Sequence, residues 1–591
     1  MLGAFAPFLL TAQQEVEKCG VKQSVLHYME SNPEYIAGVQ RAEEAAAKWR
    51  AEHPEGMKND GEITIPVVFH VVYSENDESQ NISDEIIFSQ MEVLNNAYRN
   101  LDPNADQTRE VFADLRADMK LNFALASVDP DGNATTGIVR VPTDKDSFDM
   151  FTEPDAWKHS ETGGADAWDN DLYLNIWVAK ITFFGIENAL LGVATFPSTM
   201  SAEEGNAQPA PFDEDGLTLN YRHVGVTNDP EIAPNDQGKT AIHEIGHWLG
   251  LRHIWADEDD PFTGNPGDCS QDDYVYDTPM ANQRSQQGCD LERNSCSNEN
   301  EFSDGFWGEL DPPDMVENYM DYSNDACMHM FTHGQKERAW SFMVTAREKL
   351  FGSEGRNGEH FNAYAIKTES TCLSSCDGSI TATAYWGEAP YTYSIDGGAY
   401  SSNNVFEDVC TGMHQVLIKD NAGTIVEANV ELKSNYLNPL IETSSVDASC
   451  GSCADGEASV ALTNGTPDYS YSWSTNPVQT TATAVDLLPG TYTCVITDGC
   501  GEETSQDVTV GATGIQDLNK SIAIYPNPVD DRLFIDGVES GTYSILDAQG
   551  REVLKGEVAN GIAIDTKELN EGMFILRVKT NSGVGSRVFL K

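Results

Sequence analysis

The stretch "HEIGHWLGLRH", residues 243–253, constrains this chain most, because it holds three of the twelve histidines. His243 and His247 are four residues apart, so on a helix they share one face. Gly250 allows a sharp turn after that helix, and His253 can then return to the same point. Three imidazoles in this arrangement suit a zinc ion (Zn2+) and leave a fourth position for water. We therefore predict a zinc site with these histidines as ligands.

Glu244 directly follows the first histidine and is predicted to be a general base. A carboxylate at this position can take a proton from a zinc-bound water, whose pKa the metal lowers toward neutrality. The alternative is an amphipathic helix whose histidines align by accident. In chains of this composition the joint pattern arises by chance on the order of once in ten thousand chains or fewer. The segment therefore predicts hydrolysis of an amide bond.

The chain is strongly acidic, with 95 Asp and Glu against 36 Lys and Arg and a formal net charge of −59. Nucleic acid is not an expected partner, because phosphate binding needs clustered Lys and Arg. The acidic residues are expected to form a solvated surface. There is no run of about 18 apolar residues, so no transmembrane segment is expected.

The N-terminus and the cysteines both indicate export. The start, "MLGAFAPFLLTAQ", is predicted to be the remnant of a signal peptide without its basic region, and a buried N-terminal segment is the alternative. The twelve cysteines lie mostly in polar, Gly-, Asp- and Ser-rich surroundings, which indicates disulfides. The Glu-, Ala- and Lys-rich residues 14–60 are predicted to form a helical, mostly solvated pro-segment with no strong core face.

A second motif, "VENYMDYSNDACMHMFTHGQ" at residues 316–335, lies about 70 residues downstream of the histidines. The histidine pattern followed by a methionine-containing turn is typical of the metzincins. With the strand "IPVVFHVVY" and the segment "DDYVYDTP", residues 61–352 resemble the pappalysin family of metzincin proteases, especially its small secreted bacterial members. This resemblance implies a secreted zinc endopeptidase made as a zymogen.

The resemblance also implies roles for residues of the second motif. Met320 would be the methionine of the turn that packs beneath the metal. Tyr322 would stabilise the oxyanion of the tetrahedral intermediate, a role that its phenol can fill. Glu317 lies just before the turn, where the wall of the pocket after the scissile bond is expected. Its carboxylate would favour Arg or Lys on the leaving side, and a solvated or calcium-linked Glu is the alternative.

The resemblance implies two disulfides around the site, Cys269–Cys296 and Cys289–Cys327. From the sequence alone, Cys269 could also pair with Cys289 or with Cys327. The family further binds calcium (Ca2+) near "DDYVYDTP", where closely spaced oxygen ligands suit a hard cation. The calcium candidates are Asp273, Asp277 and Thr278, and ordinary turn carboxylates are the alternative.

Cys19 stands alone in "EKCGVK", ahead of the expected catalytic domain. A thiolate is a good zinc ligand and could fill the open fourth position. The segment resembles the cysteine switch of metzincins, which keeps the precursor silent until it is cut away, with Arg50 or Lys58 as basic sites for the cut. The alternatives are a disulfide with an odd cysteine of the C-terminal half or an inert thiol.

The C-terminal half contains an internal repeat with a spacing of about 78 residues, made of short alternating strands. The repeats resemble the SprB-type repeats of Bacteroidetes surface proteins. The last block, with "IYPNPVDDRLFI" and "GMFILRV", resembles the C-terminal sorting domain of the type IX secretion system. It implies the type IX secretion machinery as a partner, followed by release or attachment to the outer cell surface.

We therefore expect a multidomain fold, an α+β metzincin-like catalytic domain followed by three small all-β domains. The expected boundaries are 1–13 for the signal remnant, 14–60 for the pro-segment, 61–352 for the protease domain, 366–433 and 440–511 for the β-sandwich repeats, and 522–591 for the sorting domain. The catalytic domain is expected to be monomeric and to act on protein or peptide substrates. A surface adhesin or glycan-binding protein with an inactive metal domain is the alternative function.

Overall fold

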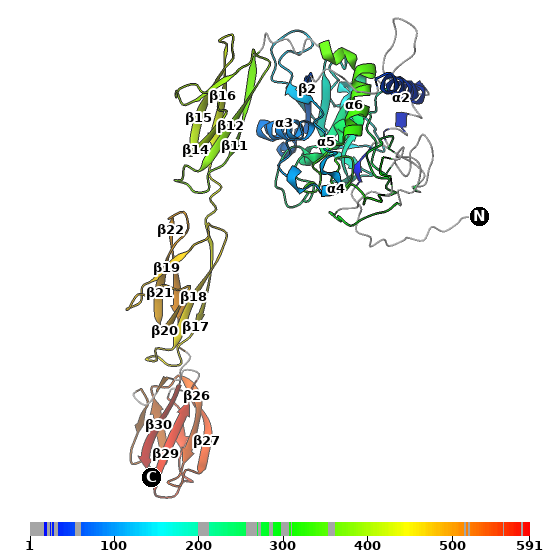
Figure 1. Cartoon of the computed structure of the whole chain (residues 1–591). Coiled ribbons are helices and arrows are strands. Elements are labelled where there is room, and N and C mark those ends of the chain that lie inside the picture. Colours follow the sequence, from blue (N-terminus) through cyan, green and yellow to red (C-terminus); the bar gives the residue numbers. More distant parts are fainter. Residues whose placement is uncertain are drawn as a thin grey trace, which may run out of the picture. The chain divides into compact units, whose positions relative to one another are not determined.

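Figure 1 shows the computed structural model of the protein, which describes residues 17–20, 24, 27–28, 34–53, 61–198, 212–255, 269, 273–282, 288–296, 306–308, 310–352, 361–512, 516–517, 521–559, 561–580 and 583–591. The predicted signal remnant and Lys58 lie outside these residues. Two compact units make up the chain: Met1–Thr368 with Ser379–Glu407 and Met413–Glu431, and Glu369–Gly378 with Asp408–Gly412 and Leu432–Lys591. No described helix is long and apolar enough to cross a bilayer.

A seven-stranded sheet lies at the centre of the first unit. Its order is β1 (Glu17–Cys19), β9 (Leu190–Ala194), β10 (Leu217–Asn220), β6 (Leu174–Ala179), β2 (Ile63–Ser74) and β3 (Leu121–Leu125), and β4 (Ile138–Thr143) also pairs with β2. β9 and β10 are antiparallel, and the other pairs are parallel. A small separate sheet contains β5 (Phe148–Asp149), β7 (Ile181–Phe183) and β8 (Ile186–Glu187).

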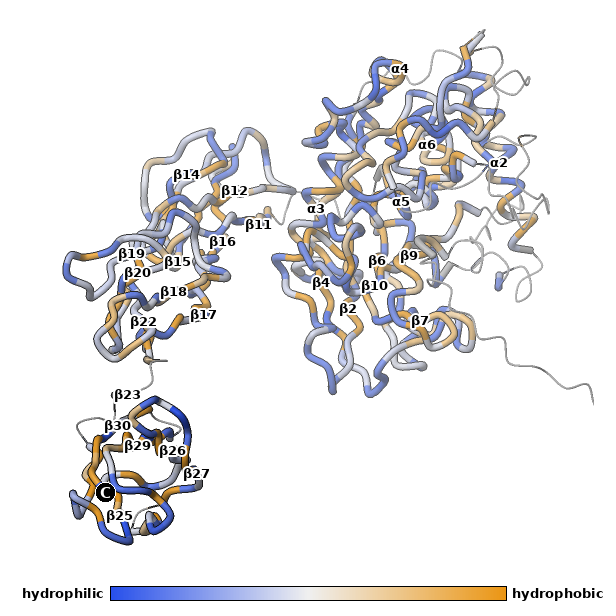
Figure 2. Tube along the Cα trace, turned by 90° about the horizontal axis from the view of Figure 1, so that it is seen from below, coloured by the Kyte–Doolittle hydropathy of each residue, from blue (hydrophilic) through white to orange (hydrophobic). Residues whose placement is uncertain are grey.

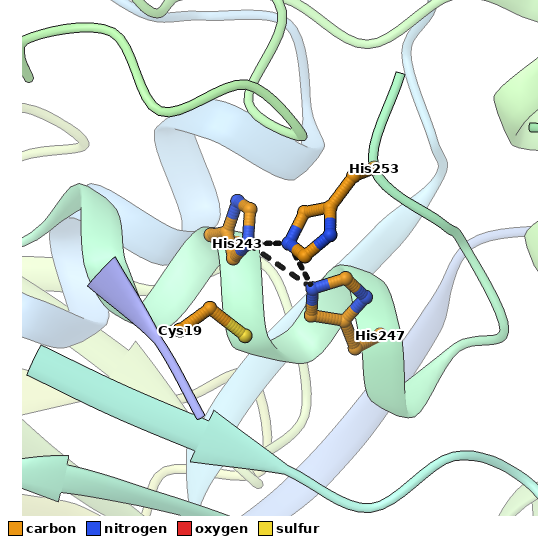
Figure 3. Close-up of side chains that lie close together, drawn as sticks. All are labelled: Cys19, His243, His247 and His253. Atoms are coloured by element: carbon orange, nitrogen blue, oxygen red, sulfur yellow. Dashed lines mark hydrogen bonds between the residues drawn. The ribbon is translucent and has the colours of Figure 1, made fainter. Parts of the chain in front are cut away.

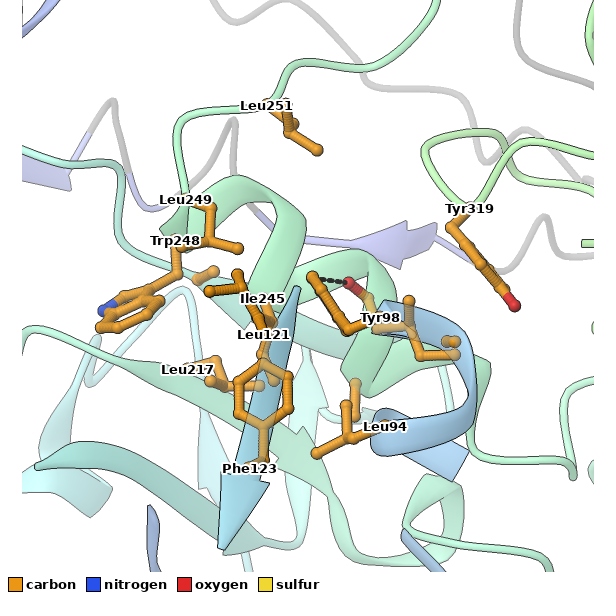
Figure 4. Close-up of a cluster of buried hydrophobic side chains, with 14 of the residues drawn as sticks. Leu94, Tyr98, Leu121, Phe123, Leu217, Ile245, Trp248, Leu249, Leu251 and Tyr319 are labelled. Carbon is orange, nitrogen blue, oxygen red and sulfur yellow. Dashed lines mark hydrogen bonds between the residues drawn. The ribbon is translucent and has the colours of Figure 1, made fainter. Parts of the chain in front are cut away.

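Two helices, α3 (Asp84–Tyr98) and α5 (Lys239–Trp248), share a hydrophobic core with this sheet. α3 buries Ile87, Met91, Leu94 and Tyr98, which recur at helical spacing. Ile245, Trp248 and Leu249 at the end of α5 lie close to Leu121, Phe123 and Leu217 of the strands (Figure 4). Strands β2 and β9 are mostly hydrophobic (Figure 2), as is typical of strands covered on both faces. The core therefore fixes the helix that carries the first two predicted zinc ligands.

The pro-segment contains a helix, α2 (Glu34–Glu52), that packs against α6 (His333–Ala346). Tyr35, Val39, Ala42 and Ala46 of α2 are buried and lie on one helical face. The prediction of a helix without a strong core face was therefore wrong. Two of the four buried residues are alanines, which in an Ala-rich helix give no hydrophobic contrast. A short helix, α4, spans Glu110–Ala113.

The two repeats and the last block each form two sheets. The first repeat contains β11 (Asn362–Thr368), β12 (Gly378–Tyr385), β13 (Thr392–Ile395), β14 (Val405–Val409), β15 (Gly412–Lys419) and β16 (Ile425–Leu432). The second contains β17 (Leu440–Val446), β18 (Gly456–Thr463), β19 (Ser470–Trp473), β20 (Thr483–Leu487), β21 (Gly490–Thr497) and β22 (Glu503–Val510). The last block contains β23 (Gln516–Asp517), β24 (Ala523–Tyr525), β25 (Arg532–Asp536), β26 (Ser540–Leu546), β27 (Glu552–Ala559), β28 (Ala563–Asp565), β29 (Met573–Lys579) and β30 (Gly583–Leu590).

This architecture, an α/β core followed by all-β modules, confirms the predicted fold class. Part of the first repeat belongs to the first unit and packs on the catalytic region. The rings of Phe88 in α3 and Tyr364 in β11 stack with centroids 5.0 Å apart, and the Trp386 indole donates a hydrogen bond of 2.7 Å to the Leu125 carbonyl. The exact domain boundaries stay predictions.

Candidate metal centre and active site

The three predicted zinc ligands lie together in the first unit. His243 and His247 project from the same face of α5, and His253 comes from the loop that follows (Figure 3). Each pair of their Nε2 atoms is 3.1 Å apart, and all three side chains are buried. Tetrahedral ligands with metal bonds of the usual zinc–nitrogen length would be about 3.3 Å from one another. The observed spacing therefore fits a single small metal ion.

In two of the rings, the hydrogen bond made by Nδ1 determines whether Nε2 carries a proton or a lone pair. His243 Nδ1 lies 2.8 Å from the Tyr319 carbonyl, and His247 Nδ1 lies 2.9 Å from the Leu251 carbonyl. A carbonyl oxygen only accepts hydrogen bonds, so each Nδ1 carries the proton and each Nε2 presents a lone pair. Converging lone pairs in a buried site repel one another unless a cation lies between them. The donor set therefore fits zinc, with the hydrogen bonds that orient metal-binding histidines already in place.

The turn between the second and third histidines depends on Gly250. Its φ of +84° is in the left-handed region, and a Cβ there would lie 2.3 Å from a ring atom of Phe342. Backbone conformation and close packing thus both require glycine. After the turn, the His253 ring stacks on Trp255 with centroids 4.3 Å apart. This stacking holds the third imidazole in its orientation.

The methionine-containing turn lies against α5. A Cβ on Gly246, between the first two histidines, would lie 2.3 Å from the Met320 sulfur, so the thioether contacts the helix backbone there. The neighbouring Tyr319 supplies the carbonyl that orients His243. Met320 and Tyr319 are fully buried. The turn thus supports the site from below and fixes one ligand ring.

Glu244 is fully buried beside the histidines, and burial raises the pKa of its carboxyl well above the ordinary value. The Cys19 thiol donates a hydrogen bond of 3.4 Å to its Oε2, which partly opposes this rise. On the other side, a Cβ on Gly192 in β9 would lie 2.8 Å from Glu244 Cγ. Gly192 was not among the predicted site residues, although a glycine within a hydrophobic strand signals close backbone approach.

Cys19 lies at the end of β1, which pairs with β9. Its sulfur and the three histidine nitrogens all lie within 4.8 Å of one another, and among the described residues this is the one such group of three or more His, Cys, Asp or Glu. Tyr322 donates a hydrogen bond of 3.4 Å to the Cys19 carbonyl and packs against His253. The structure therefore brings Cys19, Glu244, Tyr322 and the predicted ligands to one place.

The structure contains the disulfides Cys269–Cys296 and Cys289–Cys327, and not the two alternative pairings. The C-terminal half contains Cys372–Cys500, Cys376–Cys410 and Cys450–Cys453. Neither Cys19 nor the remaining Cys494 is in a disulfide. The alternative of a disulfide between Cys19 and an odd C-terminal cysteine is therefore not realised.

The calcium candidates Asp273, Asp277 and Thr278 are all buried and already hydrogen-bonded. Asp273 accepts from the Thr278 hydroxyl at 2.8 Å, whereas Asp277 accepts from Thr332 at 2.7 Å and from the Gly334 amide at 2.8 Å. Asp277 therefore stabilises the start of α6 instead of turning toward Asp273. Burial raises the pKa of Asp277 above its ordinary value. A calcium ion here stays a prediction.

The predicted role of Glu317 in substrate selection stays a prediction, and the surroundings of this side chain do not favour it. Its carboxylate is buried and accepts two hydrogen bonds from Arg109, from Nε at 2.6 Å and from a terminal nitrogen at 2.5 Å. Such a bidentate ion pair neutralises the carboxylate and uses its oxygens. Glu317 thus offers no free negative charge to a basic substrate side chain.

Two arginines of the α6 region hold the C-terminal end of α5, and the sequence analysis missed both. Arg338 donates from Nε to the Gly250 carbonyl at 2.8 Å, and Arg347 donates from Nε to the Trp248 carbonyl at 3.0 Å. Cations at this end of a helix satisfy its last carbonyls and its dipole. Arg347 also pairs with buried Asp215, at 2.6 and 3.0 Å. No local signal in the sequence connects these distant residues.

Comparisons with known proteins agree with this geometry. The family model described as pregnancy-associated plasma protein-A matches residues 159–344, the SprB repeat matches 365–400 and 443–478, and the secretion system C-terminal sorting domain matches 523–590. Extracellular metalloprotease 1 of Coccidioides posadasii is 32% identical over 302 residues, which cover 50% of this chain and 83% of that protein. Several other fungal extracellular metalloproteases match over less than half of their own length, for example 47% for that of Arthroderma otae.

Two solved structures from one bacterium are also similar. Promirolysin of Tannerella forsythia is 33% identical, with coverage of 57% of this chain and 97% of that chain and a TM-score of 0.44. Mature mirolysin of the same species, solved in complex with a cleaved peptide, is 37% identical, with coverage of 49% and 96% and a TM-score of 0.40.

Proposed function

Because the chain belongs to the pappalysin family of metalloproteases, we propose that it hydrolyses peptide bonds with zinc held by His243, His247 and His253 and with Glu244 as general base. The protein is a metalloendopeptidase that is secreted or attached to the cell surface, as its sorting domain and repeats indicate. One observation carries the choice of metal. The Nδ1 protons of His243 and His247 are held by backbone carbonyls, so their Nε2 lone pairs converge on one point.

When bound, zinc supplies a Lewis acid that polarises the scissile carbonyl and lowers the pKa of water toward neutrality. Glu244 takes a proton from the attacking water and later donates it to the leaving amine. Its buried position, which raises the carboxyl pKa, favours holding that proton between the two transfers. Tyr322 donates a hydrogen bond to the oxygen on which negative charge develops. In the precursor, the Cys19 carbonyl accepts this hydrogen bond instead.

We further propose that a substrate peptide adds as a strand to β9. In the precursor β1 covers this strand in parallel, and the Gly20 amide donates a hydrogen bond of 2.8 Å to the Gly192 carbonyl. Removal of β1 exposes the backbone groups of an edge strand, which bind extended peptides without regard to their side chains. Gly192 leaves the backbone next to Glu244 open to such a peptide. Protein or peptide substrates suit this edge.

Latency is assigned to Cys19 and β1. The thiol lies at the ligand cluster and contacts Glu244, while its carbonyl holds Tyr322, so one residue engages all three parts of the proposed chemistry. Removal of the pro-segment would open them together. Arg50, one predicted cutting site, lies in helix α2, which packs on α6. Its side chain donates a hydrogen bond of 2.7 Å to the Ser341 hydroxyl of α6. We therefore expect the first cut elsewhere in the pro-segment.

A preference for Arg or Lys on the leaving side stays a prediction, although Arg109 already pairs with Glu317, the residue predicted to set it. The alternative of an adhesin with an inactive metal domain is not favoured, since the proposed ligands, base and oxyanion donor lie close together. The decisive test is Glu244→Gln in the activated protein, which keeps the side-chain shape but removes the base. We expect cleavage of a denatured protein to fall at least about a thousandfold, with bound zinc retained. Unchanged cleavage would contradict the proposal, and Glu348→Gln, a change at an exposed site, is the control.

A further inference from the structure

The pro-segment contacts the catalytic region at a second place, which does not include Cys19. Helix α2 lies along α6, with Ala42 and Ala46 packed against Phe342. Phe342 is the residue whose ring fills the space beside Gly250. Small residues on α2 allow the two helices to approach closely. This apolar contact forms the first half of what we call the α2 docking face, which comprises Ala42, Glu43 and Ala46.

The second half of the contact is ionic. Both oxygens of Glu43 accept hydrogen bonds from Arg338, at 2.7 and 2.8 Å, in a fork-to-fork pair. Arg338 is 2% exposed, so α2 covers a cation that would otherwise face water. Burial alone would raise the pKa of Glu43, but Arg338 outweighs it and leaves the pKa below its ordinary value. Arg338 is buried and Glu43 is partly exposed, and a hydrogen-bonded ion pair of this kind slows dissociation.

The two places of contact share no residue. Cys19 and β1 meet β9, Glu244 and Tyr322, whereas the docking face meets Arg338 and Phe342 of α6. Two linked contacts raise each other's effective concentration, so loss of one does not release the segment at once. A cut between Glu52 and Ile63 would leave both contacts intact.

We propose that α2 is an independent docking helix, which holds the pro-segment on α6 through Glu43 and Arg338 after the chain has been cut. This proposal rests on the proposed function in one respect, namely that the pro-segment is removed to activate the enzyme. The segment that binds this surface of α6 is α2 itself. Glu43 of α2 pairs with the arginine of the surface, and the small side chains of Ala42 and Ala46 fit against Phe342. Activation then needs release of α2 as well as the cut.

The test uses the full chain with Cys19→Ala and Glu244→Gln, so that neither the thiol nor self-cleavage contributes. A recognition sequence for a specific protease is placed between His53 and Gly61, and retention of the N-terminal fragment is followed after the cut by size-exclusion chromatography. We expect the fragment to stay bound in this parent. Adding Glu43→Gln should raise its dissociation rate at least about tenfold, the effect of weakening a hydrogen-bonded charge pair.

The neighbouring exposed Glu44 provides the matched control, and Glu44→Gln should change the rate by less than about twofold. On the apolar part of the face, buried Ala46→Gln should release the fragment faster, whereas exposed Ala47→Gln should not. Circular dichroism before the cut shows whether each variant is folded. The proposal is overturned if the parent fragment leaves immediately, or if Glu43→Gln and Glu44→Gln behave alike. Since no hydrolysis is measured, failure of the zinc mechanism would not produce either result.

Discussion

Two sets of contacts surround helix α5, and they differ in origin and in what they touch. Contacts from the catalytic region reach the framework of the helix: Met320 at Gly246, the Tyr319 carbonyl at His243, and Arg347 at the Trp248 carbonyl. Contacts from the pro-segment reach the reactive groups, with Cys19 at Glu244 and Tyr322. The difference teaches that the pro-segment can leave without dismantling the site, because it blocks groups that other residues hold in place.

Arg338 links the two sets. It belongs to the catalytic region and holds the Gly250 carbonyl, but its carboxylate partner, Glu43, lies in the pro-segment. Arg347 performs the same task two residues earlier, at the Trp248 carbonyl, with a permanent partner, Asp215. Loss of the pro-segment therefore changes one of these two arginine contacts and leaves the other intact.

The largest effect on stability is expected for Arg347→Met, which breaks a permanent contact. It leaves Asp215 buried without its cation and removes the donor to Trp248, so the free energy of unfolding should fall by about 3–5 kcal/mol. Burial would raise the pKa of Asp215, but Arg347 outweighs it and keeps the pKa below its ordinary value. This contribution is thus present at neutral pH and is lost as the pH falls through the lowered pKa of the folded state.

Urea unfolding followed by tryptophan fluorescence at neutral and acidic pH measures this effect. The difference between Arg347→Met and the parent should narrow once the pH falls below about 4. In the double variant with Asp215→Asn, the loss should be smaller than in Arg347→Met alone, because no buried charge is then uncompensated. A loss below about 1 kcal/mol at neutral pH would show that the pair does not support α5.

A smaller loss is expected for Gly246→Ala, which tests the framework contact with Met320. The added methyl group would overlap the thioether, so we expect a cost of about 1–3 kcal/mol and weaker zinc binding. Adding Met320→Ala should recover part of both losses by making room. Gly61→Ala is the matched control, since a Cβ there meets no atom within 4 Å. If Gly246→Ala binds zinc like the parent, Met320 does not constrain the site.

The smallest effect on stability is expected on the pro-segment side, for Cys19→Ala. It removes one hydrogen bond of 3.4 Å from the precursor, so the free energy of unfolding should change by less than about 1 kcal/mol. The effect on activity should be large, because the uncut Cys19→Ala precursor should cleave a peptide that the parent precursor does not cleave. A precursor that stays silent while correctly folded and loaded with zinc would refute the role of Cys19.

The parts of the site that the sequence predicted are those encoded locally. Four-residue spacing places His243 and His247 on one helical face, and Gly250 marks the turn to His253, so the ligand set needs no knowledge of the rest of the fold. The fold class followed in the same way from alternating strands and repeats. Cys19 could be singled out because its cysteine motif is short and precedes the catalytic domain.

The parts that the sequence could not predict depend on pairs that are distant along the chain. Asp215 and Arg347 are 132 residues apart, and Glu43 and Arg338 are 295 residues apart, so no periodicity connects them. The same limit applies to the ion pair of Glu317, whose partner Arg109 is 208 residues away. For α2, the buried alanines do not differ from exposed alanines in the pattern of the sequence.

The metal content of the purified, activated protein and of two variants decides whether the three histidines hold zinc. The account predicts one zinc ion per chain in the parent and in Glu244→Gln, with hydrolysis lost in the latter, and little zinc in His247→Ala. A chelator should abolish cleavage, and added zinc should restore it. A parent without bound zinc, or a His247→Ala protein that keeps both its zinc and its activity, would contradict the account.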